Sequence, residues 1–533
     1  MKNIGLILFC LIISFNLLAQ KDCHYTITPT NPYFDGSGVA AGSTICIEAG
    51  NYNYLHLKNL KGTAANPITI VNDGKVVINT DHYFGIKVAG CQHVKIIAES
   101  ISGSYGIVVS RVANGAGLSI DELSTDIEVA GLEISNTKIG GIYAKTEPDC
   151  TLTSIRENFT MYNLIIRDCY LHDIADEGMY IGSSKYTGQE ITCNGNTTTV
   201  LPHVIEGVQV YNNIVERTGW DGIQVSSATK NCRIYNNIIR RDSQSETTWQ
   251  MSGILIGGGS TCDCYNNRIY DGKGDGIDVL GKGISHIYNN LIVRAGKSYD
   301  PSNTTNYKHG IYVGPSPDGS IANYYILHNT IISPKSDGIY YNNSNTNVNL
   351  LANNLIVAPG TTYINYNTSM TQVQLRTNYF ANNSSSVNFV NSNQDNYSLS
   401  GNSPAVNYGT NLHLNNVNFD IVGCPRPYNN AYDAGAYQYN PDWNSISEFE
   451  LGNLFVYPQP TADFVKIKGN FAPQSLYECV ITNALGQTIM TFTAHFETGT
   501  EELTIDTKNF ISGYYILKMS NRENFISTKL IIQ

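Results

Sequence analysis

A repeated unit of roughly two dozen residues runs through the middle of this chain and constrains its fold more than any other feature. One copy combines an alternating segment at 274–279 (GDGIDV) with a second apolar segment at 287–293 (IYNNLIV). A fixed period with strand-type alternation indicates a β solenoid, because each unit is one supersecondary element that stacks on the next. The turn asparagines that mark successive units are Asn213, Asn237, Asn267, Asn290, Asn329, Asn354 and Asn378.

Each unit is long enough for three short strands and three turns, which together make one coil of a parallel β-helix. Asparagines stacked at one corner would form hydrogen bonds along the axis, and asparagine tolerates the left-handed backbone that such corners need. The repeat resembles the right-handed parallel β-helix superfamily of carbohydrate-active proteins over most of the chain. This resemblance predicts an all-β solenoid, a right-handed parallel β-helix, and says much less about a reaction.

The two ends of the chain differ in composition from the repeats and predict separate segments. Residues 1–20 contain Lys2 followed by a short apolar run, which predicts a secretory signal peptide. We expect the β-helix domain at 21–440, with an N-terminal cap and a closing segment at 400–440 that covers the strand edges of the last coil. A polar linker at 441–452 leads to a C-terminal domain at 453–533.

Four motifs in the C-terminal domain resemble the sorting domain of the type IX secretion system of Bacteroidetes. They are 456–460 (VYPQP), 483–487 (NALGQ), 512–516 (SGYYI) and 529–533 (KLIIQ). Gln459 stands where that family usually has asparagine, which is a minor departure. The resemblance implies a small β-sandwich, the type IX machinery as a partner, and export across the outer membrane followed by release or surface attachment.

The formal net charge of −11 argues against a nucleic-acid partner, because binding to nucleic acid is driven mainly by basic residues. An acidic surface still admits an anionic sugar where cations cluster locally. We expect the chain to act as a monomer.

The cysteines suggest disulfides, because the chain reads as exported. Cys232 and Cys262 should stack inside adjacent coils, where a reduced ladder and a disulfide are equally open. Strand alternation in the segment 262–264 (CDC) points both sulfurs inward, which favours a structural role over a metal site. Two further plausible pairs are Cys23–Cys46 and Cys150–Cys193.

The inward residues of a β-helix fill its core, so chemistry must use the outward-facing ones. In the recurring Gly-Ile-x-Val pattern the third residue faces outward, and these residues should form one stacked column. The segment 183–201 follows one of the strands, while 240–251 and 295–309 precede two others. Long loops on both sides of a flat ribbon would form a groove suited to a polysaccharide chain. The column contains Tyr143, Tyr180, Gln224, Leu255, Asp278, Tyr312 and Tyr340.

The polar groups around this groove suggest β-elimination at a uronic acid. A base removes the proton on C5, cations neutralise the neighbouring carboxylate, and an acid protonates the departing oxygen on C4. We expect Lys308 or His309 as the base and Tyr312 as the acid. Arg241 and Lys282 are the candidate neutralisers of the carboxylate. The other candidate substrate-binding residues are Trp249, Gln224, Tyr180 and Asp278.

These groups predict a secreted carbon–oxygen lyase that acts on an anionic polysaccharide or oligosaccharide, such as an ulvan-like polymer, alginate or pectin. A glycosidic leaving oxygen would make it a polysaccharide lyase, and a free hydroxyl an oligosaccharide dehydratase; both stay open. We assign no residue to a metal. Calcium also stays open, since Asp278, Asp221 and Glu206 could supply oxygen ligands.

Two other functions are compatible with the same groove. β-Helix polygalacturonases hydrolyse their substrate with paired carboxylates, and 275–278 (DGID) faintly resembles that family, although its adjacent aspartate pair and Arg-Ile-Lys segment are missing. A non-catalytic glycan-binding surface protein is the second alternative. Asp221, Asp275 and Asp337 directly precede a glycine and are expected to satisfy backbone amides, and His309 occupies the equivalent place.

Overall fold

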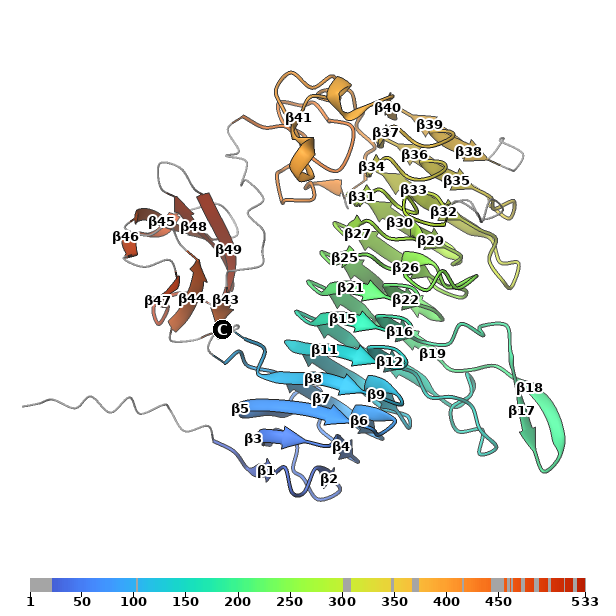
Figure 1. Ribbon diagram of the computed structural model, residues 1–533, viewed down its shortest axis with the longest axis vertical. Helices are drawn as coiled ribbons and strands as arrows, with labels where there is room; N and C mark the ends of the chain where they lie inside the picture. Colours follow the sequence, from blue (N-terminus) through green and yellow to red (C-terminus); the bar gives the residue numbers. More distant parts are fainter. Residues whose placement is uncertain are drawn as a thin grey trace, which may run out of the picture.

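The repeats fold into a right-handed parallel β-helix whose coils stack from the N-terminal strands to β40 (Figure 1). The computed structural model describes residues 22–101, 104–300, 308–346, 349–366, 373–414, 417–441, 455–457, 461, 464–470, 475–483, 488–496, 500–511, 513–520 and 525–532. The fold predicted from the sequence is therefore confirmed. The signal peptide at 1–20 and nearly all of the linker lie outside the described residues.

One face of the helix is a twelve-stranded parallel sheet that carries the outward column. Its strands run in sequence order, one per coil, because each coil contributes one strand to the face. They are β2 (Tyr33–Asp35), β4 (Leu55–Lys58), β6 (Phe84–Ala89), β9 (Ala116–Asp121), β12 (Ile142–Ala144), β16 (Met179–Ile181), β22 (Ile223–Val225), β26 (Ser252–Ile256), β29 (Asp275–Val279), β32 (Ile311–Val313), β35 (Ile339–Tyr341) and β38 (Ile364–Tyr366).

The other two faces form a 23-stranded sheet of two parallel stacks, joined by the long strand β5 (Ile68–Thr80), which pairs with both. The first stack contains β1 (Tyr25–Ile27), β3 (Thr44–Tyr52), β7 (Gln92–Ile97), β10 (Thr125–Ala130), β14 (Ile165–Arg167), β20 (Gln209–Tyr211), β24 (Cys232–Tyr235), β27 (Cys262–Tyr265), β30 (Gly283–Tyr288), β33 (Ala322–Leu327), β36 (Asn349–Ala352) and β39 (Val373–Arg376). The second contains β8 (Ile107–Val112), β11 (Leu132–Thr137), β15 (Tyr170–Ile174), β21 (Ile214–Thr218), β25 (Ile238–Arg240), β28 (Arg268–Tyr270), β31 (Leu291–Val293), β34 (Thr330–Ile332), β37 (Leu355–Val357) and β40 (Tyr379–Ala381).

The predicted asparagine ladder occupies the corner between the two stacks. Asn267 shows the pattern: its side-chain nitrogen donates to Asn290 Oδ1 at 3.0 Å and to the carbonyl of Ile234 at 2.9 Å. The same contact joins each of the seven predicted asparagines to the next, and their side chains are buried. The left-handed backbone belongs to the residue just before each ladder asparagine, such as Asn266 with φ 55°.

The glycine of each Gly-Ile-x-Val unit in the twelve-stranded sheet is required by close stacking of the coils. A Cβ atom at Gly276 would lie 2.4 Å from the carbonyl oxygen of Gly310 on the next coil. The glycines of successive units are therefore in vertical alignment, and the apolar residues beside them, such as Ile277 and Val279, are fully buried.

The closing segment at 400–440 packs on the side of the second stack, whereas we expected from the sequence that it would cover the strand edges of the last coil. Ala405, Ala434 and Ala436 are buried against Leu291 and Leu355, among others. The segment is also held by hydrogen bonds, one from Asn353 Nδ2 to the carbonyl of Thr410 at 2.8 Å. The strands β41 (Phe389–Asn391) and β42 (Asn396–Leu399) and the short 3₁₀ helices η2 (Ser384–Ser386) and η3 (Ser392–Gln394) precede it.

Three disulfides join described cysteines: Cys23–Cys46, Cys150–Cys193 and Cys232–Cys262. The first two are the pairs that the sequence suggested, and the third resolves the open choice in favour of a disulfide. Cys264 is buried and free.

Smaller sheets complete the structure. A three-stranded one contains β13 (Thr160–Tyr162), β19 (Val204–Glu206) and β23 (Ala228–Lys230), and a hairpin contains β17 (Gln189–Cys193) and β18 (Asn196–Val200). The C-terminal domain has its own apolar core between sheets of three and four antiparallel strands, which agrees with the expected β-sandwich. Its strands are β43 (Phe455–Tyr457), β44 (Phe464–Asn470), β45 (Ser475–Asn483), β46 (Thr488–Phe496), β47 (Thr500–Asp506), β48 (Gly513–Ser520) and β49 (Phe525–Ile532).

None of the described segments forms a helix with the length and apolar character that a membrane crossing requires.

Candidate active site

The predicted outward column exists on the twelve-stranded sheet. Strand register places its seven residues, from Tyr143 to Tyr340, directly beside one another on successive coils. The column continues toward the N terminus through Ser119, Lys87, His56 and Tyr33, which sequence reasoning missed. Lys87 lies in a copy of the Gly-Ile-x-Val pattern at 85–88 (GIKV) and Ser119 in the variant 117–120 (GLSI), so the pattern could have found both, whereas the strands of Tyr33 and His56 lack it.

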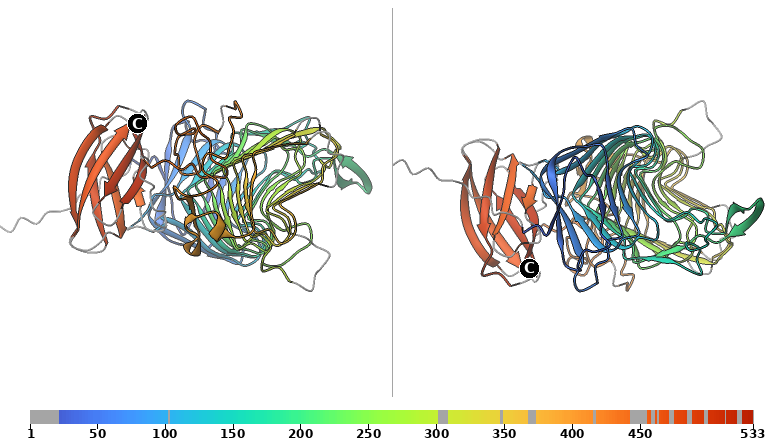
Figure 2. Two further views of the ribbon diagram at one scale, coloured as in Figure 1. Left: turned by 90° about the horizontal axis from the view of Figure 1, so that it is seen from above. Right: turned by 90° about the horizontal axis from the view of Figure 1, so that it is seen from below.

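The long loops flank the column as predicted, because all strands of this sheet are parallel. The loop with β17 and β18 follows β16, and the segments before β26 and β32 lie at the opposite edge. Figure 2 shows the hairpin β17–β18 projecting far beyond the stacked coils.

Lys308 is held beside a carboxylate at the edge of the column. Its Nζ donates to Asp275 Oδ2 at 3.2 Å, and its side chain is only 9% exposed. Burial lowers the pKa of Lys308, but the negative charges of Asp275 and Asp278 outweigh it and raise that pKa above its usual value. The ammonium is therefore charged at neutral pH, which makes it a cation rather than a free base.

Asp278 faces the same lysine from the column itself. Burial and the charge of Asp275 raise the pKa of Asp278 well above its usual value, against the attraction of Lys308. Its Oδ1 atom is buried and has no hydrogen-bond partner among the described residues. Its surroundings therefore favour the protonated form of the carboxyl.

Two more buried carboxyl groups lie near this pair, and burial shifts their pKa values in the same direction. Burial raises the pKa of Asp221 to about 8 and that of Asp242 to about 6. Asp221 accepts a hydrogen bond from the Ser252 hydroxyl at 2.7 Å, and Asp242 accepts one from Ser243 at 2.7 Å. Asp242 was not singled out from the sequence, because it lies in a loop with no periodic pattern.

His309 forms an ion-pair contact with Asp337 one coil further on. Its Nδ1 lies 3.1 Å from Asp337 Oδ2, and its ring centroid lies 4.8 Å from that of Tyr340 and 6.1 Å from that of Tyr312. Burial raises the pKa of Asp337, but hydrogen bonds from His309, Thr361 and Asn365 bring it down to about 2. The histidine, 4% exposed, is thus oriented by a permanent carboxylate.

Tyr312 supplies a neutral phenol next to these groups. Burial raises its pKa, as do the charges of Asp278 and Asp275, whereas a hydrogen bond from Asn342 opposes the shift. A phenol with a raised pKa keeps its proton at neutral pH and can donate it.

The aspartates before the glycines also fulfil their expected structural role. Asp275 Oδ1 accepts the backbone N–H of His309 at 2.5 Å, and Asp337 Oδ1 accepts that of Thr362 at 3.1 Å. Asp275 and Asp337 therefore support the backbone and the functional side chains together.

The other candidate residues lie further from this group. Lys282 donates to the Tyr186 hydroxyl at the opposite edge and lies 3.9 Å from Asp318. Tyr180 bonds to the Ser184 hydroxyl at 2.7 Å. Gln224 is only 2% exposed.

Arg241 and Trp249 are exposed on the loop before β26, Trp249 to 91%. Within the described contacts the structure brings neither of them against Asp278 or Tyr312.

The possible calcium ligands do not share one site. Glu206 belongs to β19, outside the column sheet, and pairs with Lys230 at 2.9 Å. Among the residues that the structure describes, no group of three His, Cys, Asp or Glu side chains is arranged to hold a metal ion.

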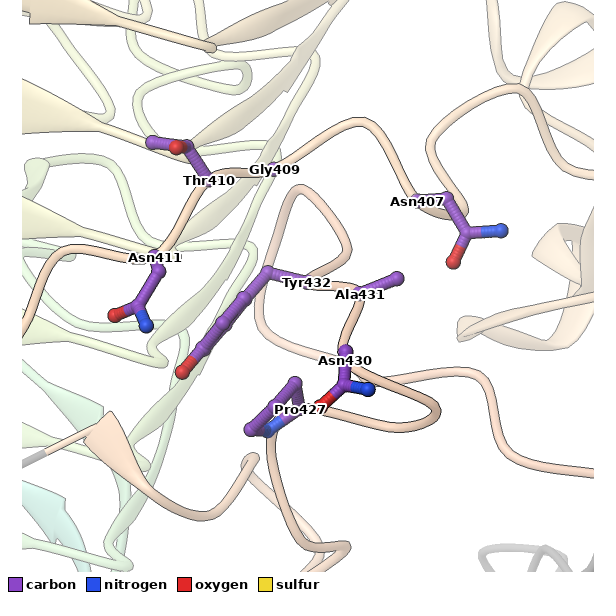
Figure 3. A pocket seen from close by; sticks show the side chains of 8 residues that line it. All are labelled: Asn407, Gly409, Thr410, Asn411, Pro427, Asn430, Ala431 and Tyr432. Carbon is purple, nitrogen blue, oxygen red and sulfur yellow. The ribbon is translucent and has the colours of Figure 1, made fainter.

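A cavity of about 400 Å³ lies in the closing segment rather than at the column (Figure 3). Its eight lining residues are Asn407, Gly409, Thr410, Asn411, Pro427, Asn430, Ala431 and Tyr432. They include no carboxylate, lysine, arginine or histidine, so proton transfer is better served by the column.

Comparison with known protein families agrees with this architecture. Residues 203–403 match the family described as the right handed beta helix region, and residues 455–533 match the secretion system C-terminal sorting domain. The chain thus contains a β-helix region and carries a type IX sorting domain.

Several solved structures resemble the chain at low identity. Pectate lyase Pel9A is 13% identical, with a TM-score of 0.45 over 78% of this chain and 97% of that one. A GH136 lacto-N-biosidase from Eubacterium ramulus is 14% identical, with a TM-score of 0.39 over 66% and 67%. The A-module of the Azotobacter vinelandii mannuronan C-5 epimerase AlgE6 is 14% identical, with a TM-score of 0.36 over 64% and 91%. No curated protein matches the sequence.

Proposed function

We propose that this chain is an exported carbon–oxygen lyase that acts by β-elimination on uronic acid residues of an anionic polysaccharide or oligosaccharide. The observation that carries the proposal is the grouping of Lys308, Asp278, His309 and Tyr312 on adjacent coils of one face. Lys308 is charged, and Tyr312 keeps its proton. Burial favours the protonated form of Asp278, and Asp337 orients His309. Each of these conditions serves one part of the elimination.

The uronate carboxylate binds between the Lys308 ammonium and the protonated Asp278 carboxyl. An ionised Asp278 would repel the substrate, and its raised pKa removes that repulsion. Together the two groups spread the charge that builds up when the C5 proton leaves. Lys308, one of two bases expected from the sequence, is thus reassigned as a neutraliser.

His309 accepts the C5 proton, and Asp337 stabilises the imidazolium that forms. The C5–H and C4–O bonds break, a C4–C5 double bond forms, and Tyr312 donates its proton to the departing oxygen. Transfer of the proton from His309 through solvent restores the phenol. Arg241, Trp249 and Lys282 contribute at the edges of the groove, where aromatic and cationic groups suit a charged sugar chain.

The test is to incubate the full-length protein with ulvan, alginate, pectin and glycosaminoglycan chains and oligosaccharides, and to record the absorbance of unsaturated uronates. Lys308→Met and His309→Asn should each lower turnover by roughly 100-fold or more, as loss of a transition-state contact does. Lys297→Met is the matched control, because Lys297 is an exposed lysine of the same loop, and this variant should keep full activity.

A second candidate is glycoside hydrolysis, favoured by one observation. Asp278 is protonated while Asp275 stays paired with Lys308, and a protonated and an ionised carboxyl are the two groups that such hydrolysis uses. New reducing ends without unsaturated product would select it. Binding without either product would leave a non-catalytic glycan-binding protein.

A further inference from the structure

Five aromatic rings form a cluster on the outer face of the first coils, on the same sheet as the candidate site. They come from β2, β4, β6 and the turns before β4 and β6, and neighbouring ring centroids lie 4.8–5.7 Å apart. Tyr33 is 41% exposed, His82 is exposed, and the other three are partly buried. This five-ring cluster consists of Tyr33, Tyr54, His56, His82 and Phe84.

The rings of the cluster are not stacked face to face, and two of them, Tyr33 and His82, are exposed. Their interplanar angles run from 48° to 83°, so each pair is tilted or edge-to-face. The tyrosines at 211, 235, 265 and 288 differ, because they stack with angles of at most 8° and cover each other's faces. Of these two groups, the five-ring cluster is the one that offers ring faces on which the C–H face of a sugar can pack.

The cluster belongs to the same column as the candidate site. Tyr33 and His56 are followed in register by Lys87 and Ser119, and then by the predicted column. Seven strand spacings separate β4 from β29, roughly 34 Å at the usual interstrand distance of about 4.8 Å. A ligand that reaches both places must therefore be a long chain.

Charges beside the cluster are paired with one another. Lys87 pairs with Glu122 at 2.8 Å and with Asp121 at 3.4 Å, and Lys58 lies 3.3 Å from Glu122. Burial and the charge of Lys87 lower the pKa of His56, which is therefore neutral at pH 7. Binding at this surface would rest on ring contact and depend little on salt.

We propose that this five-ring cluster is a remote subsite that binds the glycan chain by stacking, while another part of the same chain occupies the candidate site. The proposal rests on the proposed function for the identity of the chain. Its occupant is a polysaccharide that runs along the column, which the shared register and the paired charges beside the rings support.

The test compares Tyr33→Ala/Phe84→Ala with the wild type in affinity electrophoresis on long alginate, ulvan and polygalacturonate chains. Retardation by the bound polymer should weaken by roughly ten-fold, the scale expected for losing two aromatic contacts. Affinity for a trisaccharide of the same polymer should be unchanged. Tyr33→Phe/Phe84→Tyr, which keeps both rings, should bind like the wild type.

Tyr83→Ala is the matched control, because Tyr83 is 78% exposed and adjacent in sequence to Phe84 but outside the cluster. Unchanged retardation of the double variant overturns the proposal, as does an equal loss in Tyr83→Ala or a loss of trisaccharide binding. A wild type that binds none of the three long chains overturns it as well. If the double variant loses retardation and the wild type forms no unsaturated product, the subsite is supported and the elimination is refuted. The two proposals can therefore fail separately.

Discussion

At the scale of single residues, the candidate site depends on burial acting in opposite ways on neighbouring groups. Burial drives Asp278 and Asp221 toward the neutral form, whereas Lys308, paired with Asp275, is kept charged. A negative substrate can enter only if the carboxyl that faces it carries a proton. In the proposed elimination we therefore expect activity to depend strongly on the protonation of Asp278.

Asp278→Asn tests this directly. Because an amide resembles the protonated carboxyl, the variant should keep elimination activity within about ten-fold of the wild type at neutral pH. As pH rises through the raised pKa of Asp278, the wild type should lose activity by ionising, and the variant should lack that decline. Initial rates across the alkaline range give the comparison.

Asp278→Ala serves as the control, since it removes both the hydrogen-bonding group and the shape of the side chain. If Asp278→Asn is as inactive as Asp278→Ala at neutral pH, the carboxyl acts as a proton donor, and the hydrolytic mechanism gains support.

At the scale of elements, the asparagine ladder divides two tasks between adjacent residues. The residue before each ladder asparagine, which is asparagine at five of the seven corners, adopts the left-handed backbone, and the ladder asparagine forms the buried hydrogen bonds. The pair therefore tolerates different substitutions at its two positions.

We expect Asn267→Ala to lower the free energy of unfolding by about 1–3 kcal/mol, because it leaves buried carbonyl and amide groups without partners. Asn266→Gly, at φ 55°, should change stability far less, since glycine adopts this conformation easily. Chemical denaturation of both variants measures the difference. Equal losses at 266 and 267 would contradict the division of tasks.

The outer face of β11, β15 and β21 carries a network that should make stability depend on pH. His172 lies 3.4 Å from Glu133 and 2.6 Å from Asp173, and hydrogen bonds to both, Glu133 first, raise its pKa despite burial. A raised folded-state pKa means that the stabilisation is complete below the unfolded value of about 6.5 and is lost as pH rises through the higher folded value.

Thermal unfolding of the wild type and His172→Gln should therefore differ most at mildly acidic pH and converge at alkaline pH. Arg217, which also binds Asp173, remains in both proteins and cancels in the comparison. A stability difference that grows with pH would contradict this assignment.

At the scale of the whole molecule, periodicity explains what the sequence could predict. The coil repeat, the ladder corner and the column from Tyr143 to Tyr340 follow from residues that recur at fixed positions. His56 and Tyr33 were missed because their strands lack the recurring glycine, whereas Lys87 was missed although it lies in a copy of the pattern at 85–88 (GIKV). Asp242 and Tyr186 lie in insertions that have no repeating pattern, so their positions could not be predicted. The charge state of Lys308 depends on a contact with Asp275, 33 residues away in the sequence.

The C-terminal domain should be separable from the activity of the β-helix, because it has its own apolar core. Deleting residues 453–533 should leave the thermal unfolding of the β-helix and its glycan turnover unchanged. In a host with the type IX system, the truncated protein should stay in the periplasm while the full chain reaches the medium or cell surface. Immunoblots of cell fractions decide this, and secretion of the truncated chain would contradict the role of the domain.

The closing segment also determines when the molecule is complete. Until residues 400–440 pack against β31, β34 and β37, the apolar side chains of Leu291, Ile332 and Leu355 are exposed to water. Residues 400–440 come late in the chain, so this apolar surface can be covered only after the coils that carry it have been made. A chain truncated before residue 400 lacks both this cover and the region at 455–533 that matches the sorting domain, and we expect it to expose apolar surface and not to be sorted.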